Sequence, residues 1–267
     1  MVADRLKGVA IAGIVMGWMA GAVSADPARD LPTGRQVLDR FIEASGGRQA
    51  MLAVETRVTR GIIDFQPLGM KGQFQVYAAR PNKVRARFEL EPMGVFEQGF
   101  DGEVYWKIDP MTGPRIVKGP ERALNVALAA FDTTDYEKTF QSVRCEALED
   151  VNGTPCYKVS LQPEGCEPIA TWYARDSGLV QKEQFTIQHT VTRDPKTYLS
   201  ADYRKTGDLW MPYLSIEQIG NTAVYRQAET IELNAALPAG IFDLPEEIKA
   251  LVERDKNPVP VEPNAPM

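Results

Sequence analysis

Histidine is nearly absent from this chain, because the 267 residues include only His189. Catalytic triads and most zinc sites use imidazole as a base or a ligand, so its scarcity argues against both. The sequence also has no GxSxG, HExxH or Walker motif, and no GxGxxG motif after a strand. We therefore expect no catalytic residue, no metal site and no cofactor, with His189 in a solvent-facing or hydrogen-bonded position near a strand end.

Cysteine is also sparse, and the three residues lack CxxC spacing: Cys145, Cys156 and Cys166. This argues against structural zinc and against a thioredoxin-like redox pair. If Asn152-Gly153 forms a two-residue hairpin turn, Cys145 faces Ser160 and Cys156 faces Glu149. Cys145 and Cys156 are then about 13 Å apart along the strands, beyond the ~7 Å Cα separation of a disulfide. We predict no disulfide, although a longer, irregular loop would relax this register.

Only one long apolar run occurs, from Val9 to Ala22, and it follows two basic residues. Val23-Ser24-Ala25 after it fits the small-x-small pattern of a signal-peptidase site. We expect a signal peptide over residues 1–25, cleavage after Ala25, and a mature periplasmic protein with no transmembrane span. An uncleaved N-terminal anchor is the alternative.

The chain lacks an excess of positive charge. Its 30 Lys and Arg residues are outnumbered by 36 Asp and Glu, which gives a formal net charge of -6. Nucleic acids and anionic membrane surfaces bind clustered Lys and Arg, so neither is an expected partner.

Helical spacing of apolar residues appears in a few places. Gly34 to Ser45 has apolar residues three and four apart, with Thr33 as a candidate N-cap and Gly46-Gly47 as a stop. Gln49 to Val54 continues as one or two turns. A second helix is expected from Pro120 to Phe131, apolar on much of its circumference, so it must cover an apolar surface.

The rest of the chain alternates with the period of two that is typical of strands. Lys71 to Ala78 and Lys83 to Glu91 each have one apolar and one polar face. About a dozen such segments follow one another on short turns, of which Asp101-Gly102 and Asn152-Gly153 are the strongest hairpin signals. Short connections without alternating helices predict antiparallel neighbours.

Several segments in this order resemble the lipoprotein-carrier superfamily, which includes the outer-membrane lipoprotein-sorting proteins with a LolA/LolB-like half-barrel. They are the opening helix with its Gly46-Gly47 stop, RPNKVR at 80–85, FDGEVYWKIDP at 100–110, DVNGTPCYKV at 150–159, DSGLV at 176–180 and DLWMP at 208–212. The resemblance implies an unclosed antiparallel barrel, a helical lid and an apolar cavity for acyl chains or a peptide, without catalysis.

The expected fold is therefore mainly β (α+β). A single curved antiparallel sheet of about 11–12 strands forms an unclosed barrel, and the N-terminal and mid-chain helices cover its concave face. The half-barrel domain should span residues 26–254, with a last short helix from Glu246 to Glu253. Residues 255–267, which are rich in proline, are expected to be a disordered tail.

Aromatic and aliphatic residues of the early strands and the mid-chain helix are the candidate lining of the cavity: Phe74, Val76, Phe88, Leu90, Phe100, Trp106, Ile108, Leu124, Leu128 and Phe131. The competing interpretation is that they pack against one another as solid core, because pockets and cores use the same residue types.

These features predict a non-enzymatic periplasmic protein that binds a lipid or an acylated protein, with the mid-chain helix as a movable cover. A second hypothesis is an interaction module that binds and regulates another envelope protein. A third is a hydrolase with a carboxylate pair, for which the candidates are Glu89, Glu91, Glu97, Asp101 and Asp109. Solvated strand faces and turns are the simpler explanation of those carboxylates.

Overall fold

The structure, a computed structural model, describes residues 31–131, 133–186, 195–220 and 222–257. These residues belong to one compact unit that begins at Leu31. The predicted signal peptide, His189 and residues 258–267 of the predicted tail lie outside the described residues. Within the described ranges, no helix has the length and apolarity needed to cross a membrane.

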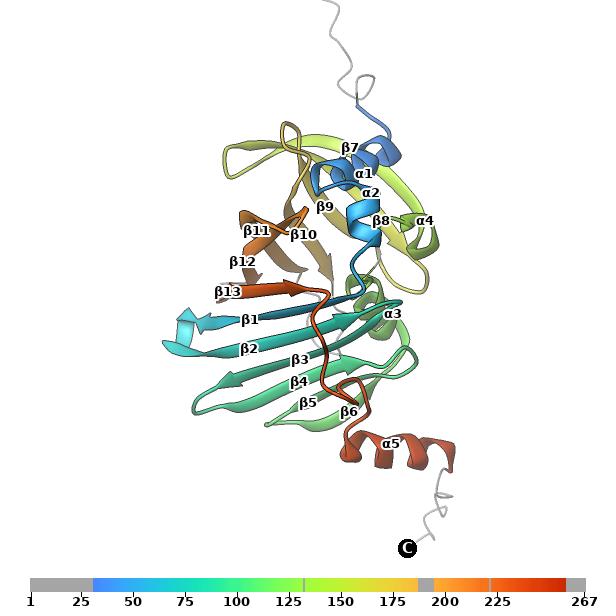
Figure 1. Cartoon of the computed structure of the whole chain (residues 1–267), viewed down its shortest axis with the longest axis vertical. Coiled ribbons are helices and arrows are strands. Elements are labelled where there is room, and N and C mark those ends of the chain that lie inside the picture. Colours follow the sequence, from blue (N-terminus) through green and yellow to red (C-terminus); the bar gives the residue numbers. More distant parts are fainter. Residues whose placement is uncertain (1–30, 132, 187–194, 221, 258–267) are drawn as a thin grey trace, which may run out of the picture. The chain divides into compact units, whose positions relative to one another are not determined.

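The described residues form one antiparallel sheet of thirteen strands (Figure 1). The first six are β1 (Thr56–Phe65), β2 (Met70–Ala79), β3 (Lys83–Leu90), β4 (Gly94–Phe100), β5 (Tyr105–Asp109) and β6 (Gly113–Val117). The other seven are β7 (Phe140–Val151), β8 (Thr154–Pro163), β9 (Ile169–Ala174), β10 (Val180–Thr186), β11 (Pro195–Thr206), β12 (Leu209–Ile219) and β13 (Thr222–Leu233).

The strand order is β6-β5-β4-β3-β2-β1-β13-β12-β11-β10-β9-β8-β7. The chain therefore starts in the middle of the sheet, runs to the β6 edge, crosses to the β7 edge and returns to the middle. β1 and β13 pair there, with Arg57 opposite Leu233 and Phe65 opposite Val224. The two edge strands do not pair with each other, so the sheet is not closed into a barrel. The expected unclosed antiparallel sheet is confirmed, with thirteen strands instead of 11 or 12.

Of the two strongest hairpin signals, one forms the expected two-residue turn and the other forms a longer loop. Asn152 and Gly153 both have positive φ, 51° and 85°, as the expected two-residue turn requires. At Asp101-Gly102 the strands instead resume pairing at Phe100 and Tyr105, which leaves a four-residue loop. The Asp101 carboxylate stabilises that loop by accepting hydrogen bonds from the backbone N–H groups of Glu103 and Val104, at 2.8 and 2.7 Å.

The cysteine register follows the prediction only in part. Cys156 lies opposite Glu149 as expected, but a β-bulge between Cys145 and Ala147 places Cys145 opposite Val159 instead of Ser160. All three cysteines are free thiols.

The helices are α1 (Gly34–Ala44), α2 (Arg48–Leu52), α3 (Gly119–Leu128), α4 (Tyr136–Thr139) and α5 (Glu246–Lys256), with a 3₁₀ turn η1 (Gln66–Leu68). Thr33 caps α1 as predicted, because its hydroxyl accepts a hydrogen bond from the Gln36 backbone N–H. Gly46 follows α1 with a φ of 129°, and a Cβ there would lie 2.3 Å from the Asp208 carbonyl oxygen. Two predicted helix ends are wrong by three residues, because α3 ends at Leu128 instead of Phe131 and α5 ends at Lys256 instead of Glu253.

The sheet has two faces with different coverings. We call the face that packs against α1 and α3 the inner face, and the opposite face the outer face. After β13 the chain crosses strands β1–β6 to reach α5, which packs against β6 (Figure 1). Arg85 points from the outer face of β3 and donates a hydrogen bond to the Ile241 carbonyl at 3.4 Å, so the crossing segment covers the outer face.

Candidate ligand-binding hollow

Three neighbouring pockets open on the inner face, and each is lined in part by α3 or by the residues that follow it. We name them the Arg57 pocket, the helix pocket and the central pocket. The Arg57 and helix pockets share Phe41, Ala130 and Thr133, and the helix and central pockets share Leu128. The inner face therefore carries a connected series of hollows along α3.

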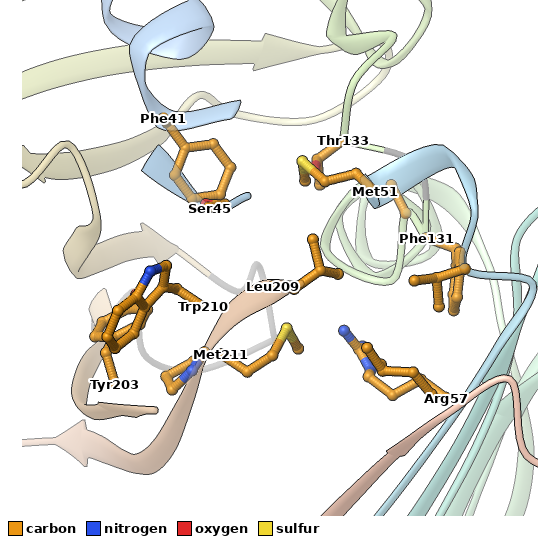
Figure 2. Close-up of a pocket in the computed structure, with 14 residues that line it drawn as sticks. Phe41, Ser45, Met51, Arg57, Phe131, Thr133, Tyr203, Leu209, Trp210 and Met211 are labelled. Atoms are coloured by element: carbon orange, nitrogen blue, oxygen red, sulfur yellow. The ribbon is translucent and has the colours of Figure 1, made fainter. Parts of the chain in front are cut away.

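The Arg57 pocket has a volume of about 200 Å³ (Figure 2). Its wall is mostly apolar and comes from α1, α2, the segment after α3, and strands β1, β11, β12 and β13. The lining residues are Phe41, Ser45, Met51, Val54, Arg57, Ala130, Phe131, Thr133, Tyr203, Leu209, Trp210, Met211, Pro212 and Leu233. Trp210, on its rim, is 42% exposed, and its backbone N–H donates to the Ser45 carbonyl at 2.9 Å.

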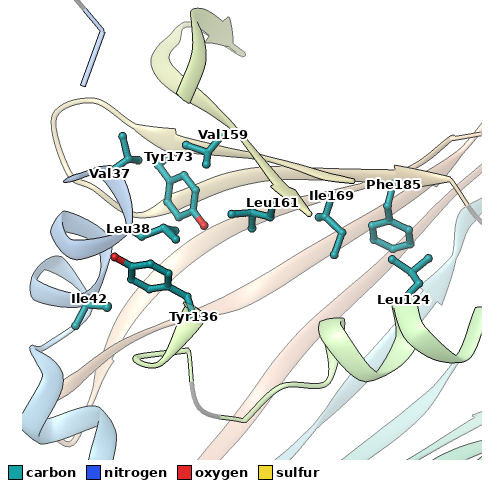
Figure 3. Close-up of a cluster of buried hydrophobic side chains, with 10 residues drawn as sticks. All are labelled: Val37, Leu38, Ile42, Leu124, Tyr136, Val159, Leu161, Ile169, Tyr173 and Phe185. Atoms are coloured by element: carbon teal, nitrogen blue, oxygen red, sulfur yellow. The ribbon is translucent and has the colours of Figure 1, made fainter. Parts of the chain in front are cut away.

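The helix pocket, about 130 Å³, lies beside a cluster of buried side chains that joins α1 and α3 to the sheet (Figure 3). Val37, Leu38 and Ile42 face the cluster from α1, and Leu124 faces it from α3. Helical spacing of apolar residues thus places both helices on the inner face. Glu183 is the one carboxylate among the described residues that line this pocket, and burial raises its pKa, which favours the neutral acid there.

The central pocket is the largest of the three, at about 440 Å³, within the usual range for small-molecule sites. Ten of the lining residues are apolar: Ile63, Phe65, Phe88, Leu90, Met93, Phe96, Leu124, Leu128, Phe185 and Val224. The polar lining residues are Gln98, Lys107, Asp109, Asn125, Lys196, Tyr198, Glu217 and Arg226.

Four of the charged groups of the central pocket are held in ion pairs, and the fifth, Asp109, accepts hydrogen bonds from the backbone N–H groups of Met111 and Thr112. Glu217, whose side chain is 8% exposed, accepts hydrogen bonds from Lys196 at 2.9 Å and Arg226 at 2.5 Å. Burial alone would raise the pKa of Glu217, but these two cations outweigh it and lower the pKa to about 2. Lys107 pairs with Glu121 of α3 at 3.0 Å. Each charge thus has a partner within the chain, which leaves the apolar part of the wall as the main surface that a ligand could cover.

The predicted cavity residues are divided among several places. Phe88, Leu90, Leu124 and Leu128 line the central pocket, and Phe131 lines the Arg57 pocket.

Three others belong to solid packing on the inner face. Phe74 stacks on Phe88 with ring centroids 6.3 Å apart, and Val76 packs in the same cluster. Phe100 packs with Tyr105, Val117 and Val126 of α3. These three residues therefore pack as core, which is the competing interpretation of the sequence.

Trp106 and Ile108 lie on the outer face, and this corrects the expectation that they share the hollow. Trp106 pairs across the strands with Gly99, lies 5.5 Å from the Arg85 guanidinium carbon, and is 1% exposed. Ile108 pairs with Glu97, which Arg85 also contacts. Strand alternation puts Tyr105, Lys107 and Asp109 on the inner face instead.

Four of the candidate carboxylates for hydrolysis, Glu89, Glu97, Asp101 and Asp109, already have partners within the chain. Glu97 pairs with Arg85 at 2.7 Å and with Arg87 at 2.6 Å, and Glu89 also pairs with Arg87. Asp101 and Asp109 each accept hydrogen bonds from backbone N–H groups of their own turns. Among the residues that the structure describes, no three His, Cys, Asp or Glu side chains gather as a metal site would require.

The sequence interpretation missed the lining residues from the second half of the chain. Phe185, Tyr198, Glu217, Val224 and Arg226 reach the central pocket because β13 pairs with β1. Their alternation predicts strands with one covered face, but nothing local indicates which distant strands share that face.

No family model matches the chain, and no curated protein matches it in sequence. Solved structures do match. The fold that they share with this chain is the LolA-like fold, an open antiparallel sheet with helices on one face. A LolA superfamily protein from Nitrosomonas europaea is 14% identical, covers 80% of this chain and 99% of its own, and has a TM-score of 0.54. A putative outer membrane lipoprotein-sorting protein domain from Vibrio parahaemolyticus is 11% identical, with coverage of 83% and 100% and a TM-score of 0.53. A DUF1329 family protein from Desulfovibrio piger is 11% identical, with coverage of 78% and 96% and a TM-score of 0.53.

These matches confirm the LolA-like fold that the sequence segments indicate. At such low identity they establish the fold alone, so the ligand has to be inferred from the residues that line the hollow.

Proposed function

We propose that the chain is an exported, non-enzymatic periplasmic protein that holds a lipid, or the acyl chain of an acylated protein, in the hollow of the inner face. The observation that carries the proposal is the central pocket, whose lining is mostly apolar and whose charged groups have partners within the chain. An apolar space of this kind favours apolar guests over water. The similarity to a domain described as lipoprotein-sorting supports the same class of ligand.

The energy of such binding is sufficient without a reactive group. Burial of one methylene is worth ~0.8 kcal/mol, so eight to ten methylenes would supply ~6–8 kcal/mol before the cost of ordering the chain. Without that cost, the upper figure would correspond to about micromolar affinity, so the gross energy leaves room for useful binding. Shape and exclusion of water are therefore enough for a carrier.

We also propose that α3 is the movable cover. Its first turn is fixed to the sheet by Glu121, while Leu128 at its other end is 38% exposed and lines both the central and the helix pockets. Outward movement of the Leu128 end about the Glu121 end would join the pockets into one groove.

Export rests on the N-terminal sequence. Cell fractionation should recover the protein in the periplasm, and N-terminal sequencing of that material should begin at Asp26. A protein that retains residues 1–25 and sediments with membranes would favour the uncleaved anchor.

The direct test is native mass spectrometry of the protein purified from the periplasm, followed by denaturing extraction. We expect a bound species that is released on unfolding and identified as a lipid or an acylated peptide. A stoichiometric protein partner without extractable lipid would favour the interaction module. Loss of a measured hydrolytic activity on changing Asp101 or Asp109 to Asn would favour an enzyme.

A further inference from the structure

Arg57 is the one charged residue among the described residues that line the Arg57 pocket. It lies on β1, and its guanidinium points toward Leu209 and Met211 in the middle of the pocket (Figure 2). Around it are aromatic rings, methionine side chains and aliphatic groups. A permanent positive charge is therefore held in a mostly apolar wall.

The guanidinium has no polar partner in the part of the chain that the structure describes. Arg57 makes no hydrogen bond or ion pair with any residue that the structure describes, and its contact is with the ring of Phe131, at 5.8 Å from the centroid. Burial lowers the pKa of Arg57, the direction expected for a cation that loses water without gaining an acceptor. Arginine nevertheless stays protonated at neutral pH.

The neighbouring arginines show what is missing at this position. Arg80 lies over the same Phe131 ring, at 5.5 Å, and donates hydrogen bonds to the carbonyls of Val54 and Met51, at 2.8 and 3.0 Å. Arg60, on the same strand, pairs with Glu232. Of these three, Arg57 alone makes no hydrogen bond or ion pair with a described residue, and its guanidinium points into the pocket (Figure 2).

A half-buried guanidinium without acceptors is costly, and an anionic ligand would supply them. The planar fork of N–H groups on a guanidinium matches the paired oxygens of a carboxylate or a phosphate. The adjoining helix pocket shares Phe41, Ala130 and Thr133 with the Arg57 pocket and is mostly apolar. The arrangement thus offers a head-group site next to a path for an alkyl tail.

We propose that the ligand is an anionic amphiphile whose carboxylate or phosphate oxygens bind Arg57, with its alkyl tail in the hollow along α3. This inference rests on the proposed function and adds a requirement for charge. A neutral lipid of the same length should bind more weakly, because it would cover the guanidinium without satisfying its donors.

The test compares three probes that carry the same sixteen-carbon tail: palmitate, hexadecyl phosphate and hexadecanol. Affinities are measured by calorimetric titration of the full-length mature protein, with each probe below its solubility limit and the two anionic probes below their micelle concentrations. We expect the wild-type protein to bind at least one anionic probe about tenfold to a hundredfold more tightly than hexadecanol. The preferred anion identifies the head group.

The key variant is Arg57→Leu, which removes the charge and keeps an apolar side chain of similar reach. It should bind the anionic probes no more tightly than hexadecanol, while hexadecanol binds at least as well as to the wild type. Arg57→Lys should retain part of the preference, because a lysine provides charge without the planar fork. Arg60→Leu is the matched control, and it should behave as the wild type.

The outcomes separate the two proposals. If the anionic probes bind Arg57→Leu as tightly as the wild type, or if the wild type does not distinguish them from hexadecanol, the head-group site is wrong and lipid binding stands. If none of the three probes binds the wild-type protein, the proposed function itself fails. The free energy of unfolding of Arg57→Leu is measured in urea. A value at least as high as that of the wild type shows that the change in binding does not come from misfolding.

Discussion

Arg115 on β6 donates two hydrogen bonds, each 2.7 Å long, to the carboxylate of Glu121 in the first turn of α3. Lys107 on β5 donates a third at 3.0 Å. Burial by itself would raise the pKa of Glu121, but hydrogen bonds from Arg115 and Lys107 outweigh it and lower the pKa to about 2. The start of the covering helix is therefore anchored to the β6 edge by charge.

The first prediction concerns acid stability. The pKa of Glu121 is lowered from an ordinary value of 4.5 to about 2, so its contribution is complete above pH 4.5 and is lost as the pH falls toward 2. The shift corresponds to ~3 kcal/mol, and Glu217 contributes with the same sign. The free energy of unfolding, measured in urea, should therefore fall by several kcal/mol between pH 6 and pH 3.

Glu121→Gln isolates this anchor. The variant should lose roughly 3 kcal/mol at pH 7, because Lys107 and Arg115 lose their buried counter-charge. Its difference from the wild type should shrink as the pH approaches 2. Glu164→Gln, at an exposed position, is the control and should track the wild type. Parallel pH curves for Glu121→Gln and the wild type would show that the ion pairs contribute no net stability.

The second prediction concerns the free end of α3. Leu128→Arg places a charge at the junction of the central and helix pockets, so the lipid retained through purification should be lost. Because Leu128 is 38% exposed, we expect less than about 1 kcal/mol of destabilisation. Leu68→Arg, at a site 59% exposed and outside the hollow, is the matched control. Lipid retention by Leu128→Arg at the wild-type level would contradict the role of α3 as the cover.

The third prediction separates the two faces of the sheet. Trp106→Ala should cost roughly 3–5 kcal/mol, because the ring is buried on the outer face, yet each folded molecule should bind lipid as the wild type does. Phe88→Ala changes the wall of the central pocket and should alter lipid affinity. The two measurements are urea unfolding and titration with a fluorescent fatty acid. A binding defect in folded Trp106→Ala equal to that of Phe88→Ala would mean that the faces are coupled.

Local sequence patterns predict most elements of this fold because each signal involves residues close in the chain. Thr33 and Gln36 form the cap of α1 within one turn, and Asn152-Gly153 sets the hairpin in which Glu149 faces Cys156. The bulge beside Cys145 shifts the register by one residue, and no residue type near it indicates that a bulge will form. Hairpin signals thus fix the pairing near a turn and lose accuracy with distance from it.

The hollow is less predictable because it depends on contacts between distant segments. Phe88 and Leu124 were identified by their apolar patterns, but their neighbours Phe185 and Val224 reach the pocket through the pairing of β13 with β1. Trp106 looks like a cavity residue in the sequence, and it is buried because the segment after β13 covers the outer face there. The sequence around Arg57 does not indicate a ligand site, because only the fold shows that its guanidinium has no partner among the described residues.

The strand order has a consequence for how the chain could be divided. Strands β1–β6 and β7–β13 are two consecutive meanders, and the ladder between β1 and β13 joins them in the middle of the sheet. A cut in the segment between α3 and α4 would interrupt no ladder, so two separate fragments would keep every native strand pair when they associate. The central pocket, which is lined from both meanders, would then be assembled from two polypeptides, each of which contributes one wall.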